Sequence, residues 1–232
     1  MNDERYARQT ALPEIGPTGQ AMIERGSVLI VGLGGLGAPA ATYLTGAGVG
    51  RIGLCDPDTV NLSNLQRQVL YTEAEVGQLK VDCAARRLAA ISGHTVFEKY
   101  PDGLTPENAR EIIGAYDIVV DCCDNFATRY LIDDVCAELG KVWVYGSIGA
   151  FHGQAAVMNG AHGLRYSYLY PDREELGRQP ASSGGVLGIV PGVIGAIEAG
   201  EALKLLGQFG EPLDGKLYVI DLKTLNTNIL QF

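Results

Sequence analysis

The sequence Ser27-Val-Leu-Ile-Val-Gly-Leu-Gly-Gly-Leu-Gly37 joins a short apolar run to a glycine-rich loop. The run 27–31 ends at glycine, which predicts a buried strand. Residues 39–48 follow as a helix of small side chains, with Pro39 tolerated in its first turn. A glycine loop between a strand and a helix favours nucleotide binding, because its backbone can approach a phosphate at the helix N-terminus.

Strands and helices continue to alternate after this unit. We predict further strands at 51–55, 96–97, 118–121 and 142–145, and helices at 76–91, 105–114 and 127–139. This alternation predicts an α/β fold, a Rossmann-like doubly wound and mainly parallel sheet. After residue 149 the pattern changes and indicates an antiparallel C-terminal lobe. We predict there a hairpin of 153–158 with 164–168, a helix at 186–206, and closing strands at 216–221 and 228–230.

We interpret residues 1–232 as a single domain, because no repeat, low-complexity tract or linker divides the chain. Its expected parts are an N-terminal helical segment at 1–26, a nucleotide-binding lobe at 27–149 and a second lobe at 150–232. The second lobe contains a loop at 170–185 that is rich in Pro, Gly, Ser and charged residues.

Composition excludes several classes of function. The chain has 18 Lys and Arg against 27 Asp and Glu, and the net charge of −9 argues against a nucleic-acid partner. Apolar runs are too short to span a membrane, and the charged N-terminus does not resemble a signal peptide. Five cysteines without C-x-x-C spacing predict reduced thiols in a cytoplasmic protein and no structural zinc.

Polar residues follow the second predicted strand. Asp56 and Asp58 stand about 20 residues after the glycine loop, where an acid would hold a ribose hydroxyl. Arg67 and Lys80 come next, and two cations at one crevice suit a triphosphate better than a dinucleotide. The alternative for both cations is a solvated charged surface.

Asp124 and Asn125 close the fourth predicted strand. Ligands of open parallel sheets bind at the carboxyl ends of the strands, so both residues are expected at the same site. Mg²⁺ is usually held by one or two carboxylates together with phosphate oxygens, which makes Asp124 a candidate ligand. The alternative is that Asp124 caps the helix that follows.

Five segments together resemble the ThiF/MoeB/HesA family, the bacterial relatives of ubiquitin-activating enzymes. They are Arg5-Tyr-Ala-Arg-Gln9, the Gly32–Gly37 loop, the block 56–68, Lys80 and the block 121–125. Residues 63–68, Ser-Asn-Leu-Gln-Arg-Gln, carry most of the specificity. The resemblance implies an adenylyltransferase that uses ATP and Mg²⁺ on the C-terminal Gly-Gly of a ubiquitin-like sulfur carrier. The carrier would be of the ThiS/MoaD type, and the second lobe would bind it and form a homodimer.

The resemblance also implies the roles of individual residues. Gly35 and Asp56 would hold the adenosine, and Asp124 would bind Mg²⁺. Arg8 resembles an arginine that reaches across the homodimer to the partner's ATP. The phosphates would lie against Asn64, Arg67 and Lys80, and the complete nucleotide-binding set is Gly32, Gly34, Gly35, Gly37, Asp56, Asp58, Asn64, Arg67, Gln68, Lys80 and Asn125.

The chain departs from the family pattern at two places. Many relatives carry two C-x-x-C pairs that bind zinc, whereas this chain has Tyr166-Ser-Tyr-Leu-Tyr170 where the first pair would stand. Relatives that form a covalent intermediate place a cysteine in the crossover loop, whereas Ala181 stands near that position here. Because alanine is no nucleophile, we expect adenylation without covalent transfer through this loop. Whether Ala181 replaces a native cysteine stays open.

Three alternatives remain on sequence grounds. The first is an adenylating enzyme for another acyl or peptide substrate, or for a transfer-RNA nucleoside, although the net charge counts against RNA. The second is a nucleotide-binding scaffold without turnover, against which Arg67, Lys80 and Asp124 argue. The third is a nicotinamide dehydrogenase, which the two cations do not suit. The pathway and the sulfur donor cannot be read from the sequence.

Overall fold

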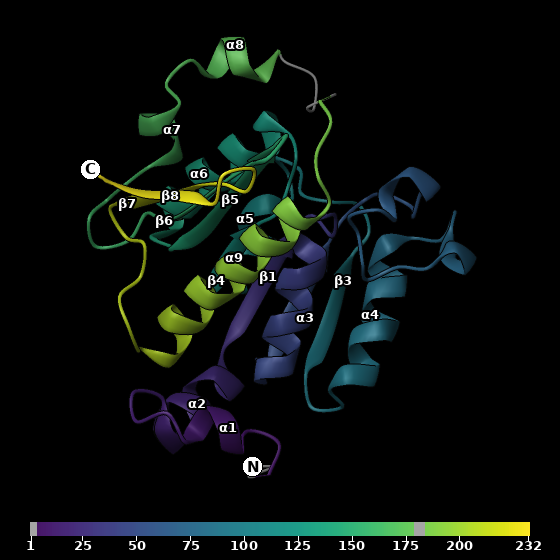
Figure 1. The fold of residues 1–232 in the computed structure, drawn as a ribbon, viewed down its shortest axis with the longest axis vertical. Coiled ribbons are helices and arrows are strands. Elements are labelled where there is room, and N and C mark those ends of the chain that lie inside the picture. The colour runs from purple at the N-terminus through teal and green to yellow at the C-terminus, as the bar shows by residue number, and fades with distance from the viewer. Residues whose placement is uncertain (1–3, 179–183) are drawn as a thin grey trace.

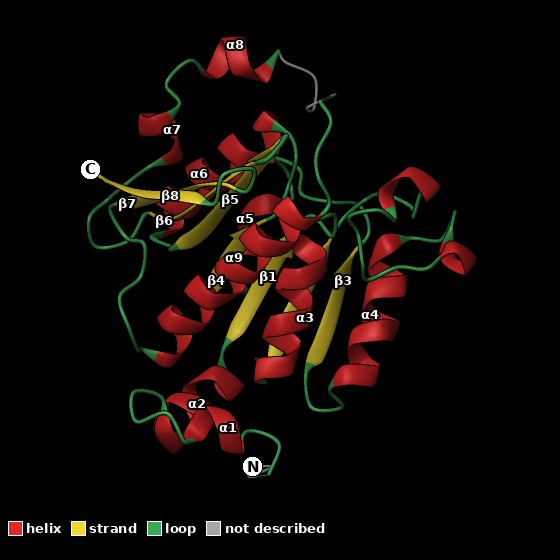
Figure 2. Cartoon of the chain, in the orientation of Figure 1, coloured by secondary structure: helices red, strands yellow, loops and turns green. Residues whose placement is uncertain are grey.

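The computed structural model describes residues 4–178 and 184–232, and the strands among them form one eight-stranded sheet in the order β3-β2-β1-β4-β5-β6-β7-β8. The first five strands of this order, from β3 through β2, β1 and β4 to β5, run parallel to one another. Strands β6, β7 and β8 are antiparallel to their neighbours (Figure 2). The predicted Rossmann-like sheet with an antiparallel continuation is therefore confirmed. The bounds are β1 Ser27–Val31, β2 Arg51–Cys55, β3 Val96–Tyr100, β4 Ile118–Asp121, β5 Trp143–Gly149, β6 His152–Met158, β7 Lys216–Asp221 and β8 Asn226–Gln231.

Helices cover both faces of the parallel part. On one face lie α3 (Gly37–Ala47), α4 (Lys80–Ile91) and α9 (Ile189–Gly207), and on the other lie α5 (Ala109–Gly114) and α6 (Phe126–Leu139) (Figure 1). Two apolar cores result, one on each face. The sheet strands are almost wholly buried at β1 and β4, as expected for parallel strands covered on both faces.

Short elements complete the described chain. Helices α1 (Ala7–Thr10) and α2 (Gly16–Arg25) lie where β1 begins, at the opposite end of the molecule from α8 (Arg173–Gly177) (Figure 1). The 3₁₀ turns η1 (Leu62–Asn64) and η2 (Glu73–Glu75) lie between β2 and α4. Within the described ranges, no helix combines the length and apolar character needed to cross a bilayer.

The predicted hairpin of 153–158 with 164–168 is wrong. Strand β6 pairs instead with β5, and the two-residue connection between them places Ala150 at φ +52°. Residues 166–169 form the helical turn α7 (Tyr166–Leu169), because the Tyr166 ring is buried against Tyr130 and Tyr145 and not in a strand ladder. The predicted loop 170–185 contains α8, and Ala181 lies outside the described residues.

Candidate active site

The carboxyl ends of β1, β2, β4 and β5 meet at one edge of the sheet. Val31 is in register with Cys55 on one side and with Asp121 on the other, so the loops after these strands converge. A cavity of about 930 Å³ lies there, a size suited to a nucleotide-sized ligand. Nine of the predicted site residues line it, namely Gly32, Gly34, Gly35, Asp56, Asp58, Arg67, Lys80, Asp124 and Asn125.

The glycines of the loop have different reasons to be glycine. Gly32 has φ +93°, and a Cβ there would lie 2.6 Å from the Cys122 carbonyl oxygen. A Cβ on Gly37 would lie 2.0 Å from the Gly32 oxygen, so the loop needs both residues for its own backbone packing. Gly37 lies outside the cavity lining, whereas Gly34 and Gly35 belong to it. Gly32 lines the cavity as well, so three of the four predicted loop glycines have backbone that can face a ligand.

Asp56 fixes the glycine loop from the tip of β2. Its carboxylate accepts the Leu33 N–H at 2.7 Å through Oδ2 and the Asp58 N–H at 2.8 Å through Oδ1. The residue is 4% exposed, and burial raises the pKa of its carboxyl although the nearby Lys80 ammonium and the two N–H donors lower it. A carboxylate retains further lone pairs after accepting two N–H groups, so Asp56 can still accept a ribose hydroxyl.

Lys80 is buried rather than part of a solvated surface. It begins α4, is 4% exposed, and its Nζ lies 2.8 Å from Asp58 Oδ2 and 3.4 Å from Asp56 Oδ2. Arg67 differs, since it is only half-buried and its guanidinium donates to the Ser63 carbonyl at 3.2 Å. Both side chains border the cavity, which brings the two predicted cations together.

Asn64 and Gln68 lie behind the lining rather than in it. The Asn64 carbonyl accepts the N–H groups of Arg67 and Gln68 at 3.0 and 2.9 Å, which shapes the turn that carries Arg67. Gln68 is buried next to Gly34, and within the described part of the chain its Oε1 has no hydrogen-bond partner. Asn64 thus shapes the turn that carries Arg67, and a nucleotide-binding role for Asn64 and Gln68 stays a prediction.

Asp124 is exposed, and its carboxylate has no hydrogen-bond or ion-pair partner among residues 4–178 and 184–232. The alternative role as a helix cap is wrong, because Asn125 is the N-cap of α6 and its Oδ1 accepts the Thr128 N–H at 2.9 Å. No group of three or more His, Cys, Asp or Glu that could hold a metal occurs in the described ranges. A cation at Asp124 would therefore need phosphate oxygens and water as its other ligands.

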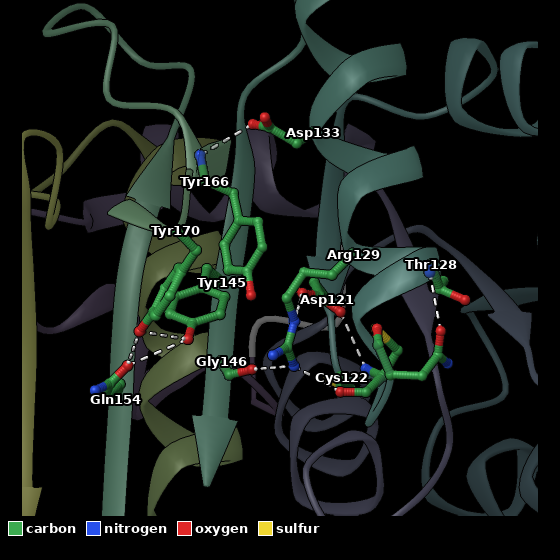
Figure 3. A network of polar contacts seen from close by, with 12 residues as sticks. Asp121, Cys122, Thr128, Arg129, Asp133, Tyr145, Gly146, Gln154, Tyr166 and Tyr170 are labelled. Carbon is green, nitrogen blue, oxygen red and sulfur yellow. Dashed lines mark hydrogen bonds and ion pairs between the residues drawn. The ribbon is translucent and has the colours of Figure 1, made fainter. Parts of the chain in front are cut away.

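Sequence reasoning missed Arg129, which lines the cavity from the first turns of α6. Its Nε lies 2.8 Å from Asp121 Oδ2, and its Nη2 donates to the carbonyls of Cys123 at 2.7 Å and Gly146 at 3.0 Å (Figure 3). The ion pair is buried. Because Asp121 ends β4 and Gly146 belongs to β5, the Arg129 side chain joins both strands to α6. The only signal in the sequence was an acid at the end of an apolar strand with an arginine eight residues later.

Arg8 and the tyrosines of residues 166–170 were also singled out in the sequence. Arg8 is an exposed residue of α1 and is not among the residues that line the cavity. Helix α1 lies at the end of the sheet where β1 begins (Figure 1). Tyr166 and Tyr170, which stand where many relatives carry the first C-x-x-C pair, pack with their ring centroids 4.8 Å apart. The hydroxyls of Tyr170 and Tyr145 both donate to Gln154 Oε1, so an aromatic cluster joins α7 to the sheet (Figure 3).

The sequence pattern of the ThiF family matches residues 6–232. The chain belongs to the ThiF family. It is 47% identical over 224 residues to a sulfur carrier protein adenylyltransferase of Thermus thermophilus, covering 94% of this chain and 83% of that protein. It is 42% identical to the adenylyltransferase and sulfurtransferase MOCS3 of Xenopus laevis, covering 94% of this chain and 48% of that one. The chain thus spans about half the length of the MOCS3 relatives.

Solved structures share the fold of this ThiF-family chain. The crystal structure of E. coli MccB with ATP has a TM-score of 0.85 at 20% identity, covering 99% of this chain and 72% of that chain. A structure of PaaA has a TM-score of 0.82 at 22% identity, covering 99% and 73%. At these identities the likeness supports the arrangement of sheet and helices.

The five cysteines of this ThiF-family chain all lie in the described residues, and all are buried. Cys122 and Cys123 line the cavity, where burial raises the pKa of both thiols far above its usual range. Burial likewise raises the pKa of Cys55 to about 12. A thiolate is the reactive form of cysteine, so none of these side chains is suited to attack an activated acyl group.

Proposed function

We propose that this chain adenylates the C-terminal glycine of a small ubiquitin-like sulfur carrier, with ATP and Mg²⁺ as the other reactants. One observation carries the proposal: Arg67, Lys80 and the unpaired carboxylate of Asp124 border a single cavity next to Gly34 and Gly35. The 47% identity to a sulfur carrier protein adenylyltransferase supports the same activity and substrate class.

The residues have separate tasks in this proposal. Gly34 and Gly35 offer backbone next to the phosphates, and Asp56 accepts a ribose hydroxyl. Arg67 and Lys80 neutralise the triphosphate. Asp124 fits Mg²⁺ because its carboxylate is exposed and unpartnered among the described residues. Bound Mg²⁺ would supply charge neutralisation on the phosphate oxygens.

The chemical step needs no nucleophilic side chain. A carboxylate oxygen of the carrier's terminal glycine attacks the α-phosphorus of ATP. The bond from that phosphorus to the bridging oxygen breaks, and pyrophosphate leaves. The chain's contribution is in-line placement and stabilisation of the charge on the leaving group, for which Arg67 and Lys80 are placed.

Sulfur transfer would use a nucleophile from outside this chain. All five thiols are buried and none is activated, so the acyl adenylate has no acceptor here among the cysteines. External sulfide would attack the acyl carbon, the carbon–oxygen bond to AMP would break, and the products would be AMP and a thiocarboxylate. A reducing cytoplasm is the compartment in which such a chain would keep its thiols free.

The second lobe would bind the carrier and a second copy of the chain. Apolar side chains are exposed on and beside β8, among them Phe151, Ile229 and Phe232, and they offer a docking surface for the carrier body. Arg8 lies far from the cavity of its own chain. It would act only in a homodimer, by reaching the partner's ATP.

ATP–pyrophosphate exchange tests the proposal directly. Exchange should require Mg²⁺ and a ubiquitin-like carrier ending in Gly-Gly, and the matched control is the same carrier without its last glycine. Exchange with another acyl substrate but not with the carrier would favour an adenylating enzyme of different specificity. ATP binding without exchange on any substrate would favour a nucleotide-binding scaffold.

A further inference from the structure

Helix α9 carries a buried carboxyl group directly behind the active site. Glu198 is 0% exposed, and both of its Oε atoms lie 3.7 Å from the Cys122 thiol, which is its hydrogen-bond partner. The carboxyl group also presses against β5, because a Cβ added to Gly146 would lie 2.3 Å from Glu198 Cδ. Cys122 lines the cavity, so its side chain connects Glu198 to the cavity wall.

The turn after β4 is held from both faces of the sheet. Arg129 on α6 binds Asp121 and the Cys123 carbonyl from one face, whereas Glu198 on α9 supports the Cys122 side chain from the other. This turn presents Asp124 to the cavity. It also backs the glycine loop, since Gly32 packs against the Cys122 carbonyl. A shift of Cys122 would therefore move Asp124 and the loop together.

Among the described residues, the titratable groups that act on Glu198 are Asp121, Cys122 and Arg129, and the one cation of the three is paired. Strand β4 contributes Asp121 and the Cys122 thiol, and α6 contributes Arg129, whose Nε binds Asp121. Strand β5 presents Gly146, which has no side chain, and α3 has no charged residue. Burial and the Asp121 carboxylate raise the pKa of Glu198 well above its usual range, although Arg129 and the Cys122 thiol lower it.

We propose that Glu198 is a positioning residue of the adenylation site, and that its neutral carboxyl group holds Cys122 and thereby the turn that presents Asp124. This inference rests on the proposed function. It predicts that the neutral isostere Glu198→Gln preserves the site, whereas Glu198→Ala leaves the turn unsupported. The matched control is Glu201→Gln, since Glu201 is also buried on α9 but accepts the Leu213 N–H and the Lys204 ammonium away from the cavity.

The first readout is the stability of the protein against pH, from urea unfolding between about pH 5 and 8. In the unfolded chain Glu198 ionises near its ordinary pKa of 4.5, whereas in the folded chain burial raises that pKa, so the proton stays bound to higher pH. The folded state thus binds one more proton in this range, and stability falls as pH rises. The unfolding constant of the wild type should therefore rise with pH relative to that of Glu198→Gln, by up to about tenfold per pH unit. Glu201→Gln should keep the slope of the wild type.

The second readout is the affinity for Mg²⁺-ATP by calorimetry, together with KM and kcat of pyrophosphate exchange. Glu198→Ala should weaken ATP binding about tenfold or more, and Glu198→Gln should restore it. Equal pH slopes for the wild type and Glu198→Gln would overturn the proposal, as would a loss of ATP affinity in Glu198→Gln. If the wild type shows no exchange with any carrier, the proposed function fails, while the slopes and the ATP affinities still decide the role of Glu198.

Discussion

Replacing Lys80 with alanine should damage both stability and activity. The ammonium group is 4% exposed and lies 3.4 Å from Asp56 Oδ2, so its removal leaves a buried carboxylate without a counterion. Breaking a buried pair in this way costs roughly 3–5 kcal/mol. We expect about 3 kcal/mol, at the lower end, because Asp56 keeps its two N–H donors. In urea unfolding this corresponds to a midpoint lowered by about 1 M, for a slope near 3 kcal/mol/M.

Two variants separate the contributions of charge and burial. Lys99→Ala removes an ion pair of similar length, 2.6 Å to Asp82, but both partners are about half exposed, so the loss should stay within about 1 kcal/mol. Arg67→Ala should lower exchange activity about 100-fold while changing stability by less than about 0.5 kcal/mol. Lys80→Ala should show the same loss of activity together with the loss of stability. From the sequence we would expect both active-site variants to fold like the wild type.

The pH dependence of this effect has a definite sign. Loss of Lys80 removes an interaction that lowers the pKa of Asp56, so in the variant that pKa rises further above its ordinary value. The folded variant then binds a proton that the unfolded chain releases, and its stability deficit grows as pH rises from about 5 to 7. If Lys80→Ala and Lys99→Ala unfolded at the same urea midpoint at pH 7, the buried ion pair would not have the role assigned to it. Full exchange activity in Arg67→Ala would refute the site assignment.

Three shorter predictions concern Asp124, the absence of zinc and the α7 segment. Asp124→Asn should abolish Mg²⁺-dependent exchange without changing the urea midpoint, because its carboxylate is exposed and unpartnered in the described chain; activity kept at millimolar Mg²⁺ would count against it as the ligand. Dialysis against EDTA should leave the melting temperature unchanged, since an aromatic cluster at Tyr166 and Tyr170 joins α7 to the sheet; a lowered melting temperature that zinc restores would show a structural metal. Asp133→Ala should destabilise the protein by about 3 kcal/mol in urea unfolding, because this 0% exposed carboxylate accepts two bonds from Arg165 and the Tyr166 N–H. An unchanged midpoint would contradict that estimate.

The parallel half of the fold could be predicted because its signals are local. A buried strand, a glycine loop and a helix of small residues follow one another within 27–48, and each signal favours the same unit. In a parallel sheet the residues that follow each strand lie at the same edge, the edge of the strands' carboxyl ends. Nine of the predicted site residues therefore line one cavity. The predicted hairpin was wrong because the position of Tyr166 depends on tertiary contacts. Its ring packs against rings from α6 and β5, which are distant in sequence.

The burial of charged groups could not be predicted from the chain alone. Lys80, Arg129 and Glu198 are each buried through a partner distant in sequence or on another element, and charged residues are usually exposed. Asn64 and Gln68 were grouped with the ligand-binding residues because they belong to the same motif as Arg67. In the structure the two parts of this motif lie in different places: the Asn64 carbonyl shapes the turn, and Arg67 borders the cavity.

Buried and exposed charges have different positions in the candidate site. This difference would let the site hold its loops in place and still bind a triphosphate. Asp56 and Asp121 are buried and occupied by N–H groups and cations, so they hold the glycine loop and the turn after β4. Asp58 differs from these two, since its side chain is 68% exposed although its carboxylate lies 2.8 Å from the Lys80 ammonium. In the proposed function, Lys80 would direct N–H bonds to phosphate oxygens while it remains beside Asp56. Donors fixed in place before the reaction need little reorganisation as charge develops, which is the condition for electrostatic stabilisation of a leaving pyrophosphate.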